Sequence, residues 1–244
     1  MATSAEQTHP ESLPEWDLND LYPGPDSPEL KSDLDHSATA ARGFQDEYRG
    51  KLAQLSGDEF ATAISRYEKL EDTLGRAMSY ASLRYAANMS DPERSRFFQN
   101  VQERINAIST ELLFFTLEIN RIDDVTLQQR LESTALAHYQ PWLRDIRAFR
   151  PHQLSDELEK LLHEKSVAGA VAWQRLFDET EATLRFPVDG KELTSAEALH
   201  LLSDADPTVR KSAAKAIGKV LGDNVRIFTQ ITNTLAKDLS LIHI

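Results

Sequence analysis

The stretch that decides the fold runs from His138 to Phe186 and reads HYQPWLRDIRAFRPHQLSDELEKLLHEKSVAGAVAWQRLFDETEATLRF. Its large apolar residues recur at intervals of three and four, which is the spacing of one face of an α-helix. The first set, which we expect to be buried, is Tyr139, Trp142, Ile146 and Phe149. Pro151 ends this segment, because a proline inside a helix removes a backbone hydrogen bond.

Two further amphipathic helices follow in the same stretch. Ser155 is a suitable N-cap, and Asp156 and Glu157 supply the negative charge that the first turn of a helix favours. The apolar stripe of this helix is Leu158, Leu161 and Leu162, and the next helix carries Val167, Ala170, Trp173, Leu176 and Phe177. Gly169 lies within the second of these segments and predicts the close approach of another backbone.

This stretch contains the segments PWLRDIRAFRPHQLSDELEKLLHEKS and AWQRLFDET. Both segments resemble the N-terminal half of oligoendopeptidase F, a zinc peptidase of the M3, thimet oligopeptidase-like family. The segments SYASLRYA at 79–86, LLFF at 112–115 and FTQITNTLAKD at 228–238 occur in the same order. The likeness extends from Pro14 to Asp238. It implies a cytoplasmic metalloendopeptidase that hydrolyses oligopeptides, in which these helices form the wall of a deep substrate channel.

Enzymes of this kind bind zinc through two histidines four residues apart on a helix, with a glutamate beside the first as general base and a more distant third ligand. The histidines of this chain are His9, His36, His138, His152, His163, His200 and His243, and no two are three or four apart. His163 and Glu164 begin a similar phrase, but Val167 occupies the place of the second ligand, so we expect this pair on the water-facing side of its helix. The sequence therefore predicts no catalytic, cofactor-binding or metal-ligating residue here. Zinc would be bound by a missing C-terminal catalytic half.

The composition limits the partners and the compartment. The 39 acidic and 27 basic side chains give a formal charge of −12, which disfavours nucleic acid and anionic membrane surfaces. The absence of cysteine fits a reducing cytoplasm. The first residues, MATSAEQTHPES, do not resemble a secretory signal, and the longest strongly apolar run, Leu112–Phe115, is too short to span a membrane.

The N-terminal region predicts a polar leader followed by a packed arm. We expect residues 1–13 to be disordered, because they are small and polar. The apolar residues that we expect to anchor the arm are Trp16, Leu18, Leu21 and Tyr22. A first helix is predicted from Glu29 to Leu52.

Two long helices follow, and they are predicted to form an antiparallel hairpin because only the short link NMSD separates them. The first is expected from about Glu59 to Ala87 with Asp58 as its cap, and the second from Pro92 to Arg121 with Asp91 as its cap. The apolar positions of the second form a heptad seam of Phe98, Val101, Ile105, Ile108, Leu112, Phe115, Ile119 and Ile122.

A seam of this kind is also typical of a coiled-coil interaction protein, so a non-enzymatic helical scaffold is the alternative. Apolar residues outside the seam favour a helix that packs on several neighbours: Phe97, Leu113, Phe114 and Leu117. The fold class predicted is therefore all-α, an elongated helical bundle with a long antiparallel helical hairpin and one small β-hairpin.

The β-hairpin is predicted because Leu184, Phe186 and Val188 alternate before the tight-turn pair Asp189–Gly190, with Pro187 confining the strand to an edge. It either frames the entry of peptides, as the resemblance allows, or simply links two helices. Helices are then expected after the capping pair Thr194 and Glu197, after Asp206, and near 224–238. The segment LLSDADPTVRKSAAKAIGKV at 201–220 resembles one HEAT repeat, but a solenoid needs several copies.

These patterns divide the chain into four parts. Residues 1–120 hold the arm and the helical hairpin, 121–190 the helical segment typical of oligoendopeptidase F, and 191–238 the beginning of the M3 catalytic domain. Residues 239–244 read LSLIHI, which resembles translated adapter sequence, so we expect them to be a non-native tail.

Overall fold

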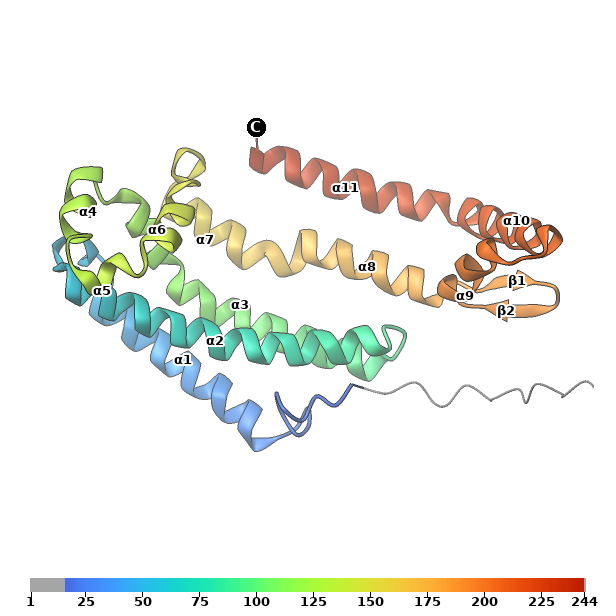
Figure 1. Ribbon diagram of the computed structural model, residues 1–244, viewed down its shortest axis with the longest axis horizontal. Helices are drawn as coiled ribbons and strands as arrows, with labels where there is room; N and C mark the ends of the chain where they lie inside the picture. Colours follow the sequence, from blue (N-terminus) through green and yellow to red (C-terminus); the bar gives the residue numbers. More distant parts are fainter. Residues whose placement is uncertain (1–15, 244) are drawn as a thin grey trace, which may run out of the picture.

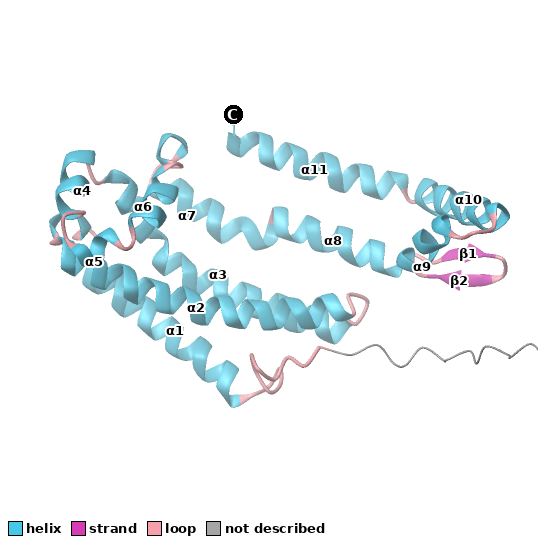
Figure 2. Cartoon of the chain, in the orientation of Figure 1, coloured by secondary structure: helices cyan, strands magenta, loops and turns pink. Residues whose placement is uncertain are grey.

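The computed structural model describes residues 16–243, and this part of the chain is almost entirely helical. Figure 1 shows three long helices side by side: α1 (Pro28–Tyr48), α2 (Gly57–Ala87) and α3 (Pro92–Arg121). A second layer, formed by α7 (Asp156–Lys165), α8 (Ala170–Thr183) and α11 (Val225–His243), lies along them, and Figure 2 shows one small pair of strands at its far end. The predicted all-α class, with one β-hairpin, is confirmed.

The N-terminal arm is anchored mainly by Tyr22, which is 2% exposed and donates a hydrogen bond of 2.8 Å from its hydroxyl to Asp33. Leu18 and Leu21 pack partly against the core. The prediction for Trp16 was wrong, because this side chain is 86% exposed. The predicted disorder of residues 1–13 falls outside the described residues.

The first helix buries one face, which consists of Leu30, Leu34, Ala41, Phe44 and Tyr48. It ends at Tyr48 rather than Leu52, because Gly50 adopts a positive φ of 76° and turns the chain. A 3-10 turn at Leu52–Gln54 follows.

The helical hairpin is confirmed almost to the residue. The N-cap of α2 is Ser56 rather than Asp58, because Ser56 and Glu59 form a reciprocal capping box. Glu59 Oε2 accepts a hydrogen bond of 2.8 Å from the Ser56 N–H, and Ser56 Oγ accepts one of 3.3 Å from the Glu59 N–H. Asp91 caps α3 as predicted.

The core lies where α3 meets its neighbours. Ile108 and Leu112 are 5% and 1% exposed, whereas Ile105 is only half-buried. Helix α3 contacts α1, α2, α6 and α7, and the residues outside its seam, Phe114 and Leu117, are buried as well. This burial identifies α3 as the centre of a globular bundle rather than one strand of a free coiled coil.

Three short helices close one end of the bundle: α4 (Asp124–Arg130), α5 (Thr134–Ala137) and α6 (Gln140–Arg147). Arg147 holds α6 on the C-terminus of α3, since its guanidinium donates to the carbonyl oxygens of Ile119 and Ile122 at 2.8 Å. A cation is favourable at this end of a helix.

The predicted buried face of α6 needs correction. Leu143, at 1% exposure, is its fully buried residue, whereas Tyr139, Trp142 and Ile146 are half-buried. Phe149 is 71% exposed, because α6 ends at Arg147 and a 3-10 turn at Arg150–His152 redirects the chain away from the helical face.

Helices α7 (Asp156–Lys165) and α8 (Ala170–Thr183) are joined by a 3-10 turn at Ser166–Ala168. Ser155 is the N-cap of α7, although its side chain makes no capping hydrogen bond. The backbone that approaches Gly169 belongs to its own preceding turn, since an added Cβ would lie 3.2 Å from the Lys165 carbonyl oxygen. The apolar stripe of α7 is not buried: Leu158, Leu161 and Leu162 are 49%, 50% and 38% exposed.

The C-terminal unit follows the predicted order. Strands β1 (Phe186–Val188) and β2 (Lys191–Leu193) pair antiparallel around Asp189 and Gly190, both with positive φ. Helices α9 (Ser195–His200) and α10 (Pro207–Asp223), separated by a 3-10 turn at Leu201–Ser203, lead to α11 (Val225–His243).

Helix α11 returns antiparallel along α8, with the Phe177 and Phe228 rings 5.4 Å apart (Figure 1). Its backbone continues five residues past Asp238, where the predicted helix ends; the packing of side chains beyond residue 239 falls outside those described. In the described part of the chain, no helix combines the length and apolarity required to cross a membrane.

Candidate functional site

The histidines do not form a metal centre in the described part of the chain. The described side chains, those of residues 16–239, include no group of three or more His, Asp or Glu arranged to hold a metal ion. The donor set that zinc requires, three protein ligands around an open position, is therefore not supplied by these residues. No catalytic step can be assigned to zinc through them.

His163 has a structural role instead. It does not face water as predicted, because its Nε2 lies 2.9 Å from the hydroxyl of Ser109 on α3. Asn106, also on α3, donates from Nδ2 to the His163 carbonyl oxygen at 2.9 Å. These contacts attach α7 to α3 through polar groups, which explains how α7 can dock while its leucines remain exposed.

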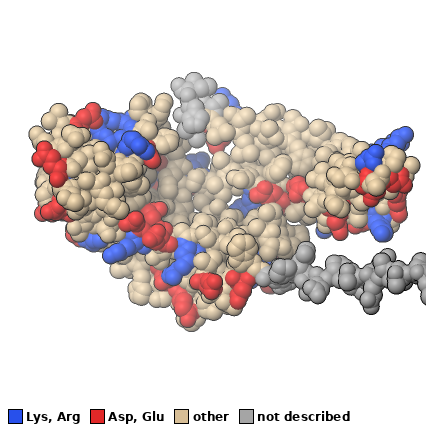
Figure 3. Space-filling view, in the orientation of Figure 1, with Lys and Arg blue, Asp and Glu red and all other residues tan. Residues whose placement is uncertain are grey.

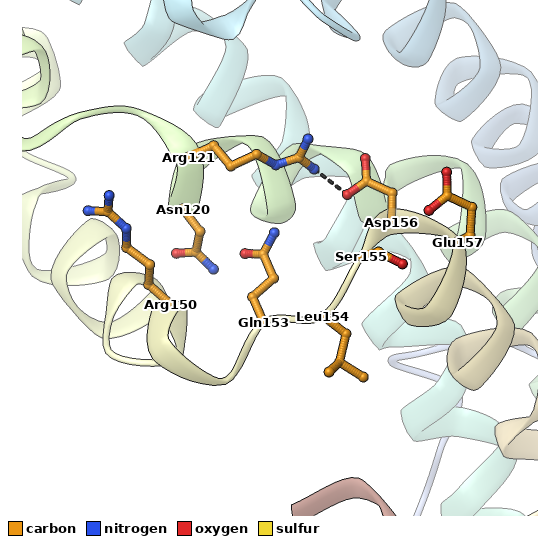
Figure 4. Close-up of a pocket in the computed structure, with 8 residues that line it drawn as sticks. All are labelled: Asn120, Arg121, Arg150, Gln153, Leu154, Ser155, Asp156 and Glu157. Atoms are coloured by element: carbon orange, nitrogen blue, oxygen red, sulfur yellow. Dashed lines mark hydrogen bonds and ion pairs between the residues drawn. The ribbon is translucent and has the colours of Figure 1, made fainter.

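A cavity of about 640 Å³ lies between the C-terminal end of α3 and the start of α7 (Figure 4). We call it the α3–α7 cavity. Its lining comes from two short segments: Asn120 and Arg121 on one side, and Arg150 and 153–157 on the other. The chain reaches this position because α6 ends early and the turn after Pro151 brings the N-terminus of α7 against α3.

Three of the four charged side chains that line the cavity, Arg121, Arg150 and Asp156, form ion pairs, and Glu157 is the exception. Arg121 forms an ion pair with Asp156, and Arg150 lies 3.2 Å from Asp124. Since these side chains are largely in water, each pair stabilises the fold only weakly.

Two amide oxygens in the cavity have no partner. Asn120 is 6% exposed, and both its Oδ1 and the Oε1 of Gln153 are buried without a hydrogen bond. Gln153 is oriented by Nε2, which donates to the Leu117 carbonyl oxygen at 3.3 Å. Figure 4 shows the two amides turned toward each other. Neither oxygen is accessible to solvent, so neither is an acceptor for a ligand in the cavity, and Ser155 has no neighbouring histidine or lysine among the lining residues to activate it as a nucleophile.

A second cavity, of about 590 Å³, opens between α2 and α6, and we call it the α2–α6 cavity. Its walls include the rings of Tyr67, Tyr139 and Trp142, and its acidic side is formed by Glu68, Glu71 and Asp72. The Tyr67 and Trp142 ring centroids are 6.0 Å apart.

Two ionisable groups of this cavity, Glu71 and Tyr67, have raised pKa values. The Glu71 side chain is exposed at the mouth of the cavity. The protein around its carboxylate nevertheless displaces enough water to raise its pKa, although a hydrogen bond from Tyr67 acts in the opposite direction. Burial, and then the charge of Glu71, raise the pKa of Tyr67. The hydroxyl of Tyr139 donates to Glu68 Oε2 at 3.3 Å.

The prediction from the sequence names no site residue, and it identified neither of the two cavities. Tyr139 and Trp142 were interpreted as part of a core face, and the acidic residues of α2 were given no role. The local signal was the spacing of Glu68, Glu71 and Asp72, which places three carboxylates on one face of a helix beside Tyr67. The approach of α6, some 70 residues later, could not be read from that spacing.

Comparisons with known proteins bear on the same region. The family model described as Oligopeptidase F matches residues 118–186, a range that includes every residue lining the α3–α7 cavity. Oligopeptidase PepF of Bacillus subtilis is 29% identical over 259 residues, which cover 98% of this chain and 36% of that protein. Group B oligopeptidase PepB of Streptococcus agalactiae is 25% identical over 245 residues, or 97% of this chain and 39% of the relative.

The fold is shared with a solved structure. The crystal structure of oligoendopeptidase-F from Enterococcus faecium matches with a TM-score of 0.74 and 22% identity, covering 86% of this chain and 42% of that one. The chain thus spans between 36% and 42% of the length of these three proteins. The resemblance predicted from the sequence is confirmed: the chain is similar in sequence to oligopeptidase F, and it shares the fold of oligoendopeptidase-F.

Proposed function

We propose that this chain is the N-terminal part of a zinc-dependent oligoendopeptidase that hydrolyses short peptides in the cytoplasm. Its helices wall the substrate channel, and the zinc ligands and general base belong to a catalytic half outside this sequence. The observation that carries the proposal is the relation to oligopeptidases over 97–98% of the chain. In this proposal residues 1–120 form the arm and hairpin, 121–190 the oligoendopeptidase F-type segment and 191–238 the beginning of the catalytic domain.

Exposed apolar side chains support the proposal that the catalytic half covers part of this surface. They lie on α7, α8 and α11, and include Leu158, Leu161, Leu176, Phe177 and Val225, each between 39% and 59% exposed. Figure 3 shows that the surface over α8 and α11 carries few charged side chains on this face. Large exposed apolar surfaces in proteins usually mark an interaction site.

The alternative, a helical scaffold that binds partners through its hairpin, has less support. The apolar seam of the hairpin is already buried within this chain, because α2 and α3 pack against each other and against α1. Among the exposed large apolar side chains of the described residues, the hairpin contributes only Leu83, whereas α7, α8 and α11 contribute seven.

The test separates the helical wall from the catalytic centre. Zinc binding by the purified chain is measured by calorimetry, and hydrolysis of a quenched fluorescent peptide is followed with and without a chelator. We expect neither tight zinc binding nor hydrolysis, because the described residues offer no zinc donor set. Chelator-sensitive turnover by the chain alone would contradict the proposal that the catalytic groups lie elsewhere.

A further inference from the structure

The α2–α6 cavity combines aromatic walls with uncompensated negative charge. Glu68, Glu71 and Asp72 occupy positions i, i+3 and i+4 of α2, and like charges at this spacing repel one another. No lysine or arginine is among the residues that line the cavity, and the one lining side chain that can become positive is the imidazole of His138. None of the three carboxylates forms an ion pair with a basic side chain of residues 16–239.

The aromatic rings make this arrangement more than a patch of acidic residues. Tyr67 and Trp142 lie 6.0 Å apart at an angle of 45°, and Tyr139 stands beside them with its hydroxyl bonded to Glu68. Ring faces attract a positive charge, most strongly where water is partly excluded. The bond between Tyr139 and Glu68 fixes one ring and one carboxylate relative to each other.

These features favour one class of ligand. A metal ion needs several oxygen ligands at close range, and no metal-ligating group of this kind occurs among the described residues. A neutral apolar ligand would leave the carboxylates unpaired. A cation with apolar surface satisfies both the rings and the carboxylates.

We propose that the α2–α6 cavity binds an organic cation, a guanidinium or alkylammonium group, with its charge toward Glu68, Glu71 and Asp72 and its apolar part against Tyr67, Tyr139 and Trp142. This site does not depend on the proposed peptidase function, and its test requires no catalytic activity. The cavity volume of about 590 Å³ is within the range of small-molecule sites and accommodates an arginine side chain.

The test uses calorimetry on the purified chain with N-acetylarginine amide, whose only charge is its guanidinium. N-acetylcitrulline amide, which has nearly the same shape without the charge, is the ligand control, and calcium chloride tests for a plain carboxylate site. We expect saturable binding of the arginine derivative that weakens as salt is added, and no saturable binding of the citrulline derivative. Stronger binding of calcium than of the arginine derivative, or equal binding of the two amides, would overturn the proposal.

Two sets of substitutions locate the binding. The cavity variant is Glu68→Gln, Glu71→Gln and Asp72→Asn, and the matched control removes the same charge elsewhere by Glu132→Gln, Asp189→Asn and Glu192→Gln. We expect the cavity variant to lose about tenfold or more in affinity, the change that 1.4 kcal/mol produces, and the control to bind nearly as the unmodified chain. Equal loss in both variants would show a general charge effect and refute the site.

The aromatic contribution is tested at Tyr139. Tyr139→Leu removes the ring and should weaken binding by roughly two- to fivefold, whereas Tyr139→Phe keeps the ring and should restore most of it. Circular dichroism confirms that both variants remain helical. If Tyr139→Phe lost as much affinity as Tyr139→Leu, the ring would have no part in binding.

Discussion

At the scale of single residues, the two glycines of α2 show that local packing decides whether an added methyl group stabilises or destabilises the fold. An added Cβ on Gly57 would lie 2.6 Å from the Arg130 carbonyl oxygen and from Ser133 Cβ, so the turn between α4 and α5 would have to move. Gly75 has no atom within 4 Å of such a Cβ. The same substitution therefore has opposite consequences in one helix.

We expect Gly57→Ala to lower the free energy of unfolding by about 1 to 3 kcal/mol, the usual cost of overpacking. Gly75→Ala should raise it by about 0.4 to 1 kcal/mol, because alanine restricts the unfolded chain and favours the helix. Urea denaturation of both variants measures the difference. Two changes of the same sign would show that the approach of 130–133 to α2 is not as described.

The capping box of α2 gives a prediction of pH dependence. Hydrogen bonds from the backbone N–H and then the hydroxyl of Ser56 lower the pKa of Glu59 below its ordinary value of 4.5. A carboxylate with a lowered folded-state pKa stabilises the fold above the unfolded-state value, and this contribution is lost as the pH falls through the folded-state value.

Glu59→Gln keeps the capping geometry but removes the charge. The unmodified chain should be more stable than this variant above pH 4.5, and the difference should shrink as the pH falls below that value. Denaturation at a series of pH values measures it. Glu132→Gln is the control, since the exposed Glu132 carboxylate makes no hydrogen bond to the described residues; a pH-independent difference for Glu59→Gln would contradict the assignment.

At the scale of elements, α3 organises the bundle. It contacts helices on several sides, and Ile108 sits in its buried seam at 5% exposure. Ile108→Ala should lower the free energy of unfolding by about 2 to 5 kcal/mol through lost burial and a residual cavity. Val125→Ala, at a position 68% exposed, is the control and should change stability little. Chemical denaturation that showed no cost for Ile108→Ala would refute the central position of α3.

Most of these elements could be predicted, because their signals are local. The capping residues, the Asp189–Gly190 turn and the three–four spacing of α2 and α3 act within a few residues of chain. Periodicity defines a face but not its partner, so the leucines of α7 were read correctly as a stripe while their exposure could not be foreseen. Phe149 was misplaced because a 3-10 turn interrupts the period. The two cavities form only where distant segments meet, and no local pattern contains that information.

At the scale of the whole molecule, two layers meet along α3, and the outer layer leaves apolar surface free. Leu158 and Leu161 on α7 are about half exposed. We expect the isolated chain to self-associate as its concentration rises, because burial of such surface is favourable. Leu158→Gln with Leu161→Gln should shift sedimentation velocity profiles toward the monomer.

Leu199→Gln is the control, since Leu199 is 55% exposed but lies on α9, away from α7. It should leave the association nearly unchanged. A chain that remains monomeric at all concentrations, or equal effects of the two variants, would contradict the assignment of the α7 surface as one that another protein segment covers.

The central claim is that these helices act as the N-terminal wall of a peptidase. The most direct measurement is the hydrolysis of a quenched fluorescent peptide by a fusion of residues 16–238 to the part of Bacillus subtilis Oligopeptidase PepF that follows its region of similarity. The PepF part alone is the control. We expect chelator-sensitive hydrolysis by the fusion that exceeds the control on the order of 100-fold, because the wall positions the peptide at the catalytic centre. A folded, zinc-loaded fusion no more active than the PepF part alone would contradict the account.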